Sequence, residues 1–234
     1  MDDNIEAEVR RADPDRWLAS RLISDGAVRT DVLAVLAFDA ELARVRAVVS
    51  EALLGEIRLT WWQEALDEIT QQRPVRRHPT VQALALSIQS RDLSRVLLSS
   101  LIEARIEDLD GAVFGDPDKA MAHIDQTSVA LSALILQILS PGTDLHTVQA
   151  VSRAYGLARL RLAGRLTPEL ATGWAPQRIS ADLALGAQAI RALPVEAFPA
   201  IAHCALTKSL AKGREPGPLT KRALIFWASL TGRV

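Results

Sequence analysis

Two groups of carboxylates in this 234-residue sequence have a spacing that could hold a divalent cation. Glu64 and Glu68 stand four residues apart in one predicted helix, and Glu103 and Glu107 repeat that spacing further along the chain. Side chains four residues apart share one face of a helix, and carboxylate oxygens are the ligands that Mg²⁺ prefers. Neither pair has an evident facing cluster, however, and a solvent-exposed helix face explains both pairs more simply.

A row of arginines among leucines is the second chemical feature. Arg159, Arg161 and Arg165 could line a cavity that binds an anion, because guanidinium groups pair with phosphate and carboxylate oxygens. Alternatively, their long stems lie along a half-buried helix and carry the charges out to solvent. The sequence leaves both interpretations open.

Motifs for several other reaction classes are absent from the sequence. It contains no phosphate-binding P-loop, no glycine pattern of dinucleotide-binding folds and no G-x-S-x-G nucleophile turn. The four histidines are scattered, and no two are four residues apart as in a helical zinc site. The single cysteine, Cys204, has apolar neighbours, so we expect a buried, unreactive thiol.

Composition favours a folded protein that does not bind nucleic acid. Apolar residues make up 49% of the chain, and 27 Lys and Arg are balanced by 28 Asp and Glu. Phosphate contacts normally require a basic excess. The acidic start lacks the apolar segment of a signal peptide, and the longest apolar run, 128–139, is too short to span a bilayer. We expect one domain over 1–234, no transmembrane segment and a cytoplasmic location, with membrane-surface association left open.

The periodicity of apolar residues predicts an all-α fold. Leu, Ala and Arg are frequent and runs of alternating β-branched residues are few, which favours helices over strands. One helix is predicted to start at Pro14. Ser50 is the expected N-terminal cap of the helix predicted over 50–69. Further helices are predicted over 32–48, 50–69, 80–90, 93–114, 118–139, 147–166, 181–192, 195–212 and 219–230.

Adjacent tryptophans in the 50–69 helix must face different directions. Trp61 and Trp62 lie about 100° apart around a helix axis. We expect Trp61, together with Leu54 and Ile57, to face the core. Trp62 is then expected to be partly exposed or to pack on a neighbouring helix.

The stretch from Arg58 to Leu66, which contains Arg58-Leu59-Thr60-Trp61-Trp62, resembles the R-L-x-W-W-x-x-x-L segment of the squalene/phytoene synthase family. Other segments resemble the family in the same order: Ala37-Phe38, 101–109, 153–157 and Trp174-Ala175-Pro176. The resemblance implies a single-domain isoprenoid-synthase-like bundle of helices around a central cavity.

In that family, two helices each present an Asp-x-x-x-Asp pair that holds Mg²⁺ against a prenyl diphosphate. Aligned on Phe38, the first pair would fall at Ala43 and Ala47; aligned on Tyr155, the second would fall at Ala163 and Thr167. None of these four residues is acidic, so the resemblance predicts no catalytic residue, no metal and no cofactor. The remaining candidates for lining the cavity or binding an anion are Phe38, Glu41, Arg58, Tyr155 and Arg159.

The segment 37–43 resembles the A-F-N-x-E-L-A stretch of a divergent family branch, which includes a mitochondrial assembly factor of respiratory complex I. This resemblance implies a pseudoenzyme, a catalytically silent binding or assembly factor whose client is a respiratory-complex subunit. The acidic start, without a transit peptide, suggests a bacterial relative of that branch. Two alternatives remain. One is a prenyl-diphosphate transferase with a rearranged Mg²⁺ site built from Asp39, Glu41 or the Glu64–Glu68 pair. The other is a binder of an anionic isoprenoid or lipid, in which arginines replace Mg²⁺.

The charge of Arg159 gives a further structural prediction. An unpaired guanidinium in a low-dielectric interior costs several kcal/mol, so this side chain must reach solvent, an acid or a bound anion. We predict that Arg159 faces the cavity and forms an ion pair with Asp39, Glu41 or the helix that carries Glu103 and Glu107.

Overall fold

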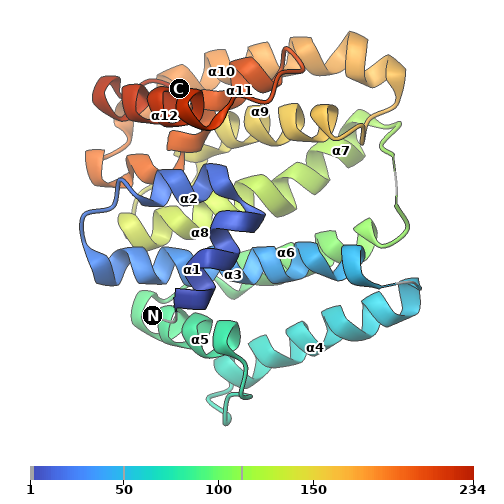
Figure 1. Ribbon diagram of the computed structural model, residues 1–234, viewed down its shortest axis with the longest axis vertical. Coiled ribbons are helices and arrows are strands. Elements are labelled where there is room, and N and C mark those ends of the chain that lie inside the picture. Colours follow the sequence, from blue (N-terminus) through green and yellow to red (C-terminus); the bar gives the residue numbers. More distant parts are fainter. Residues whose placement is uncertain (1–2, 50, 112) are drawn as a thin grey trace.

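The protein is a bundle of helices in the computed structural model, which describes residues 3–49, 51–111 and 113–234 (Figure 1). No strand occurs among these residues, and one isolated bridge joins Phe114 to Leu166. The predicted all-α fold is therefore confirmed.

The first half of the described chain forms α1 (Asp3–Ala12), α2 (Pro14–Ser20), α3 (Gly26–Val48), α4 (Ala52–Thr70), α5 (Pro79–Arg91) and α6 (Arg95–Asp108). It continues with α7 (Pro117–Ile124), the π-helical turn η1 (Asp125–Val129), α8 (Ala130–Leu139) and α9 (His146–Leu162). The last part forms η2 (Leu170–Trp174), α10 (Ala175–Ala189), η3 (Ile190–Ala192), η4 (Val195–Ala200), η5 (Ala202–Leu206), α11 (Thr207–Leu210) and α12 (Pro218–Thr231).

Helices α3 and α8 pack against each other near the centre of the bundle. Their buried residues, such as Leu33, Phe38 and Leu134, are almost completely excluded from solvent. In Figure 1, α4 lies at the lower edge against α6, and α9 and α10 pair at the upper edge. The last helix, α12, lies beside α2, so segments from the two ends of the chain are neighbours.

The α7–η1–α8 run confirms the predicted 118–139 helix and adds a π-helical turn to it. By length and composition alone, 117–139 could cross a membrane, but 61% of its most apolar window is buried inside the molecule. A core helix has the same properties.

Several predicted helix boundaries are wrong, each for a local reason. Helix α3 starts at Gly26 because Asp25 caps it, accepting a hydrogen bond from the Ala27 amide at 2.8 Å. The 93–114 helix already ends at Asp108, and Pro199 lies where the predicted 195–212 helix breaks into two 3₁₀ segments and one short α-helix. Helix α1 was not predicted, and the expected cap Ser50 lies outside the described residues.

The prediction that Trp61, Leu54 and Ile57 face the core is wrong, whereas the expectation that Trp62 packs on a neighbouring helix is confirmed. Trp62 is only 5% exposed and packs edge-on against Phe38, with the ring centroids 5.5 Å apart. Trp61 is partly exposed, and Leu54 and Ile57 are 46% and 57% exposed. Helix α4 instead buries the face of Gly55, where an added Cβ would lie 2.4 Å from the Leu109 side chain. This close approach to α6 rotates the buried face by one residue.

Candidate functional site

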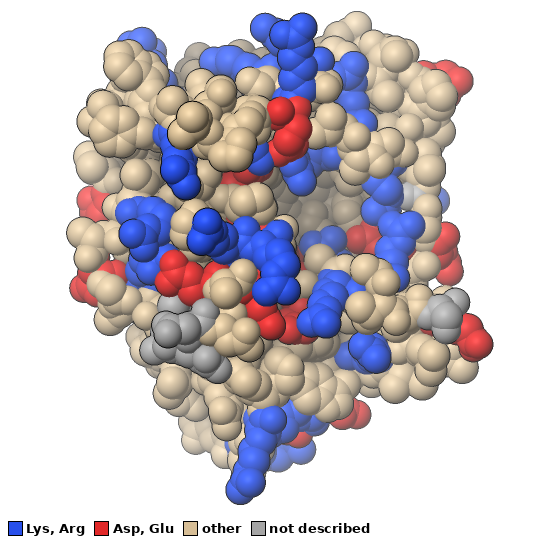
Figure 2. Space-filling model, viewed as in Figure 1, with Lys and Arg blue, Asp and Glu red and all other residues tan. Residues whose placement is uncertain are grey.

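A cavity of about 320 Å³ lies among α2, α3, α6, η1 and α9, and the start of α12 closes one side of it. A hollow opens near the middle of the face in Figure 2, with Lys and Arg as well as Asp and Glu around it. Four carboxylates line the cavity, from Asp13, Asp15, Asp39 and Glu215, and so do four cationic side chains, from Arg16, Arg105, Arg159 and Lys221.

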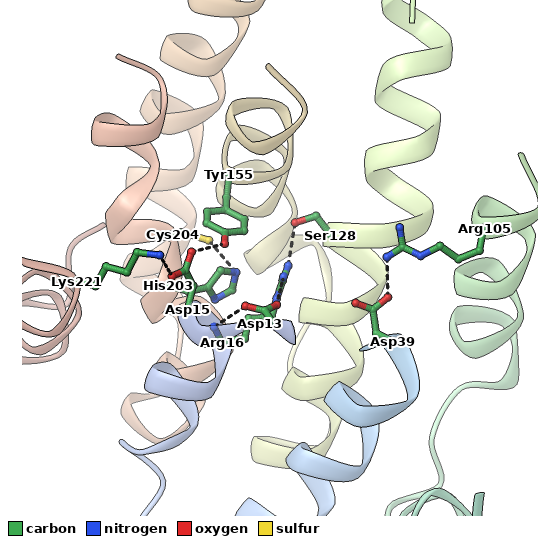
Figure 3. A network of polar contacts seen from close by, with 10 residues as sticks. All are labelled: Asp13, Asp15, Arg16, Asp39, Arg105, Ser128, Tyr155, His203, Cys204 and Lys221. Atoms are coloured by element: carbon green, nitrogen blue, oxygen red, sulfur yellow. Dashed lines mark hydrogen bonds and ion pairs between the residues drawn. The ribbon is translucent and has the colours of Figure 1, made fainter. Parts of the chain in front are cut away.

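The first turn of α2 supplies three of these charged groups. Asp13 caps the helix by accepting a hydrogen bond from the Arg16 amide at 2.9 Å, and it also accepts one from the Arg16 guanidinium at 2.9 Å. The other end of that guanidinium donates to the Ser128 hydroxyl at 3.0 Å, across the cavity on η1 (Figure 3). Arg16 Nε is buried without a hydrogen-bond partner. Capping therefore places a charged pair inside the bundle.

The partly buried Asp13 carboxyl is held in its ionised form by Arg16. Burial raises its pKa, but the charge and hydrogen bonds of Arg16 outweigh burial and leave the pKa below its usual range. The pKa of Arg16 is raised in turn, since Asp13 favours its charged form more strongly than burial opposes it. Each group thus favours the charged form of the other.

A second chain of contacts connects α2 to α9 and α12. Asp15 is 2% exposed, and accepts hydrogen bonds from the Tyr155 hydroxyl at 2.9 Å and from Lys221 Nζ at 2.6 Å (Figure 3). Lys221 also donates to Glu215, which pairs at 3.0 Å with Arg159. The Glu215 carboxylate therefore bridges two cations at the rim of the cavity.

Ion pairs also occupy the opposite wall. Arg105 contacts Asp39 at 3.0 Å and Asp108 at 3.2 Å, and Arg165 contacts Asp108 at 2.7 Å. His123 lies 3.8 Å from Asp108, and burial lowers the pKa of this histidine. This wall resembles the internal ion pair that the sequence predicts, but Arg105 supplies the guanidinium in place of Arg159.

Behind Tyr155 lies a buried pair of adjacent residues, His203 and Cys204. The His203 ring packs edge-on against Tyr155 with centroids 4.6 Å apart, and burial lowers its pKa well below the usual value. Burial raises the pKa of Cys204 to about 12, and its side chain is 1% exposed. The predicted burial of this thiol is confirmed.

The positions aligned with the family's metal-binding pairs do not form a metal site. Ala43 lines the cavity, whereas Ala47 is exposed outside it. Helix α9 ends at Leu162, and the Gly164 amide closes the last turn by donating to the Arg161 carbonyl at 3.1 Å, with a φ of +66°. Ala163 and Thr167 therefore lie beyond the helix and could not present paired ligands.

The remaining acids do not replace the missing pairs. Every carboxylate that lines the cavity is already in contact with a Lys or Arg. Within the described ranges, no group of three or more His, Cys, Asp and Glu is placed to hold a metal ion. Glu64 and Glu68 contact Arg76, and Glu103 and Glu107 are exposed on α6. These residues do not fit the family's magnesium cluster.

The sequence-predicted arginines have different roles in the structure. Arg159 lies at the cavity rim and pairs with an acid, but that acid is Glu215 and none of those predicted. Arg161 donates to the backbone carbonyl of Ala171 at 2.6 Å, and Arg165 contacts Asp108. The row of arginines thus secures the end of α9, and one member reaches the cavity.

The five candidate residues from the sequence fall in three places. Tyr155 and Arg159 line the cavity, and Phe38 is fully buried in the core. Glu41 and Arg58 line a separate groove of about 540 Å³ between α3 and α4. We call this second concavity the α3–α4 groove; it is lined by Glu41, Arg44, Val45, Val48, Ile57, Arg58, Trp61, Trp62 and His78.

Sequence reasoning missed most of the cavity's charged residues. The sequence predicts a helix start at Pro14, but it does not single out the flanking Asp13 and Asp15, nor Arg105 and Lys221, as cavity residues. Asp-Pro-Asp-Arg is an ordinary capping sequence, and nothing local shows that it points into the bundle. The partners of Asp15 are 140 and 206 residues away in the sequence.

An all-helical bundle around a central cavity is the architecture of the isoprenoid-synthase class. The crystal structure of squalene synthase HpnC from Alicyclobacillus acidocaldarius matches this fold with a TM-score of 0.70, at 15% sequence identity. The match covers 98% of this chain and 93% of that one. The family model for squalene/phytoene synthase matches residues 9–160, and the chain belongs to that family.

Curated relatives give a more specific comparison. Complex I assembly factor 6 of Bos taurus is 28% identical over 144 residues, and that of Homo sapiens is 28% identical over 144 residues. These matches cover 62% of this chain and 42% of each relative. The similarity therefore spans less than half of the length of those relatives.

Proposed function

We propose that this protein is a catalytically silent member of the family that acts as a binding or assembly factor for respiratory complex I, working in the cytoplasm on a subunit of that complex. One observation carries the proposal: the carboxylates of the cavity are neutralised by the chain's own Lys and Arg. The aligned metal positions carry Ala43, Ala47, Ala163 and Thr167. The similarity to complex I assembly factor 6 supports the choice of client.

The alternative of an active prenyl-diphosphate transferase is tested directly. Purified protein is incubated with farnesyl or geranylgeranyl diphosphate, Mg²⁺ and NADPH, and released diphosphate is measured. We expect release no faster than in a mixture without protein. Release above that level, lost in the variant Asp39→Asn, would show a rearranged metal site and contradict the proposal.

The assembly role requires a separate experiment in the native host. Deleting the gene should reduce the amount of assembled complex I on native gels and the NADH:quinone oxidoreductase activity of membranes. Reintroducing the wild-type gene should restore both. Unchanged complex I in the deletion strain would contradict the assembly role without bearing on catalysis.

Binding of an anionic isoprenoid or lipid is the second candidate function, and the position of Glu215 favours it. Its carboxylate bridges Arg159 and Lys221 at the rim, where the oxygens of an anionic ligand could contact the same two cations. Glu215→Gln should then bind farnesyl diphosphate, without metal, more tightly than wild type in calorimetry. Equal absence of binding in both proteins would exclude this function.

A further inference from the structure

Helix α12 is apolar on both faces, but only one face is covered by the protein. Ile225 and Ala228 are 3% and 2% exposed and pack into the bundle. On the other side, Leu219, Phe226, Trp227 and Leu230 are 77%, 58%, 67% and 64% exposed. A helix that only completes the core of a monomer would carry polar residues there.

The four exposed residues form one continuous stripe. Positions 219, 226 and 230 recur at the seven- and four-residue spacing of a single helix face, and Trp227 adjoins them. The stripe extends over roughly 16 Å of helix, given a rise of about 1.5 Å per residue. Scattered exposed apolar residues are ordinary, but a contiguous stripe of large ones marks a surface that contacts something else.

The segment around this stripe is basic, although the whole chain has a formal charge of −1. From Cys204 onward it has six Lys and Arg, at Lys208, Lys212, Arg214, Lys221, Arg222 and Arg233, but a single acid, Glu215. Lys221 and Glu215 pair with each other at the rim of the cavity, so the other charged side chains of this segment are all positive. Figure 2 shows uncharged surface over α12, with Lys and Arg beside it.

We propose that the outer face of α12 docks onto the surface of a membrane that contains anionic lipid. A helix with Trp, Phe and Leu on one face and basic residues beside them is suited to the interface, where the apolar side chains enter the acyl boundary. Trp is favoured at that depth, and Lys and Arg interact with anionic headgroups. The proposal does not depend on the assembly role.

A membrane fits this face better than a protein segment does. The stripe lies on the outer side of a helix, and its residues line neither the central cavity nor the α3–α4 groove. A lipid surface needs no such groove. The helix is also fixed in orientation, because its Lys221 donates to the buried Asp15 at 2.6 Å. The stripe is therefore held outward without any rearrangement of the fold.

Sedimentation with lipid vesicles tests the proposal. The full chain is mixed with vesicles of phosphatidylcholine alone, or with about a quarter phosphatidylglycerol to supply negative charge. We expect binding to the anionic vesicles that weakens as salt is raised and is weaker on phosphatidylcholine. The variant Phe226→Ser/Trp227→Ser should lower the partition coefficient at least about tenfold, since both aromatic side chains then leave the acyl boundary.

A matched control removes two exposed apolar residues elsewhere. Leu86→Ser/Val96→Ser changes side chains that are 68% and 77% exposed on α5 and α6, and it should leave vesicle binding unchanged. Equal losses in both double variants, or no binding of wild type to anionic vesicles, would overturn the proposal. A third result would also overturn it: a dimer seen by sedimentation velocity without lipid, which the α12 variant abolishes and the control variant does not. A second copy of the chain would then cover the stripe.

Discussion

The central cavity and the α3–α4 groove lie on opposite faces of α3, and they differ in whether their charged side chains form ion pairs. Asp39 and Ala43 of α3 face the cavity, whereas Glu41, Val45 and Val48 face the groove. Asp39 forms an ion pair with Arg105. Each of the other carboxylates that line the cavity likewise contacts a Lys or Arg. In the described part of the chain, no ion pair involves the groove residues Glu41, Arg44 or Arg58, which line it beside the exposed Ile57 and Val48.

This difference separates residues that stabilise the fold from residues that remain available to a ligand. Charges that are buried and mutually paired cannot be removed singly without leaving a partner unpaired. Charges beside exposed apolar groups are solvated and can be changed at little cost to stability. We therefore expect substitutions in the cavity to act on stability and substitutions on the groove walls to act mainly on binding.

The largest effect is expected where the groove floor meets the core. Trp62→Ala removes a side chain that is 5% exposed and packed on Phe38, and it should lower the free energy of unfolding by about 3–5 kcal/mol. Trp61→Ala should cost clearly less, because Trp61 is partly exposed. Urea denaturation measures both, and equal losses would contradict the observed orientation of α4.

Removing the guanidinium of Arg105 should have the next largest effect. Arg105→Ala removes the cation that Asp39 and Asp108 share. The free energy of unfolding should fall by about 2–3 kcal/mol. This is less than for a fully buried pair, because the Arg105 side chain is 18% exposed. Arg58→Ala on the groove wall should change stability by less than about 0.5 kcal/mol. A cost for Arg58→Ala as large as that of Arg105→Ala would remove the distinction between the two regions.

Acidification should destabilise the protein through its buried histidines. Burial lowers the pKa of His203 and of His123, while both regain an ordinary pKa of about 6.5 on unfolding. Below about pH 6.5 the unfolded chain binds more protons than the folded one. As the pH is lowered, the free energy of unfolding therefore falls by up to about 1.4 kcal/mol per pH unit for each histidine. Urea midpoints between neutral pH and pH 5 measure this slope.

The contribution of one histidine to that slope can be isolated. His203→Phe keeps an aromatic ring against Tyr155 but cannot bind a proton. The variant's stability should depend less steeply on pH between about 6.5 and 5 than that of wild type, whatever its stability at neutral pH. An unchanged slope would show that His203 does not contribute to it.

The smallest effect is expected from restoring one pair of carboxylates. Ala43→Asp/Ala47→Asp returns the first Asp-x-x-x-Asp spacing to α3, but α9 still ends at Leu162 before the second. Calorimetric titration with Mg²⁺ and pyrophosphate should give no saturable heat for wild type or for this variant. A saturable signal in wild type would instead place a metal site in the cavity as it stands.

Helix content could be predicted from the sequence because it depends on local periodicity. The helices α5, α7–α8 and α12 lie within a few residues of their predicted ranges, since Pro and Gly mark their ends. The end of α9 was missed because an Arg-rich stretch continues past Leu162, and only the positive φ of Gly164 ends the helix. The rotation of α4 goes with the close approach of Gly55 to Leu109, the residue that follows α6, and this contact is distant in the sequence.

The polar interior was harder to predict than the helices. The family resemblance locates the cavity on α3 and α9, and Tyr155 and Arg159 are indeed there. The pairings, however, join Asp39 to Arg105 and Asp15 to Lys221, residues far apart in the sequence. Charges of both signs are distributed along the whole chain, so composition could not identify these partners.

The contact between Asp15 and Lys221 also affects how the chain can fold during synthesis. Asp15 is synthesised well before its cationic partner Lys221, which follows 206 residues later. Until Lys221 has been made, the Asp15 carboxylate lacks the cation that it contacts in the folded bundle. Such distant pairing slows folding and prolongs exposure of apolar surface. Helix α2 should therefore reach its final packing only after α12 has been made.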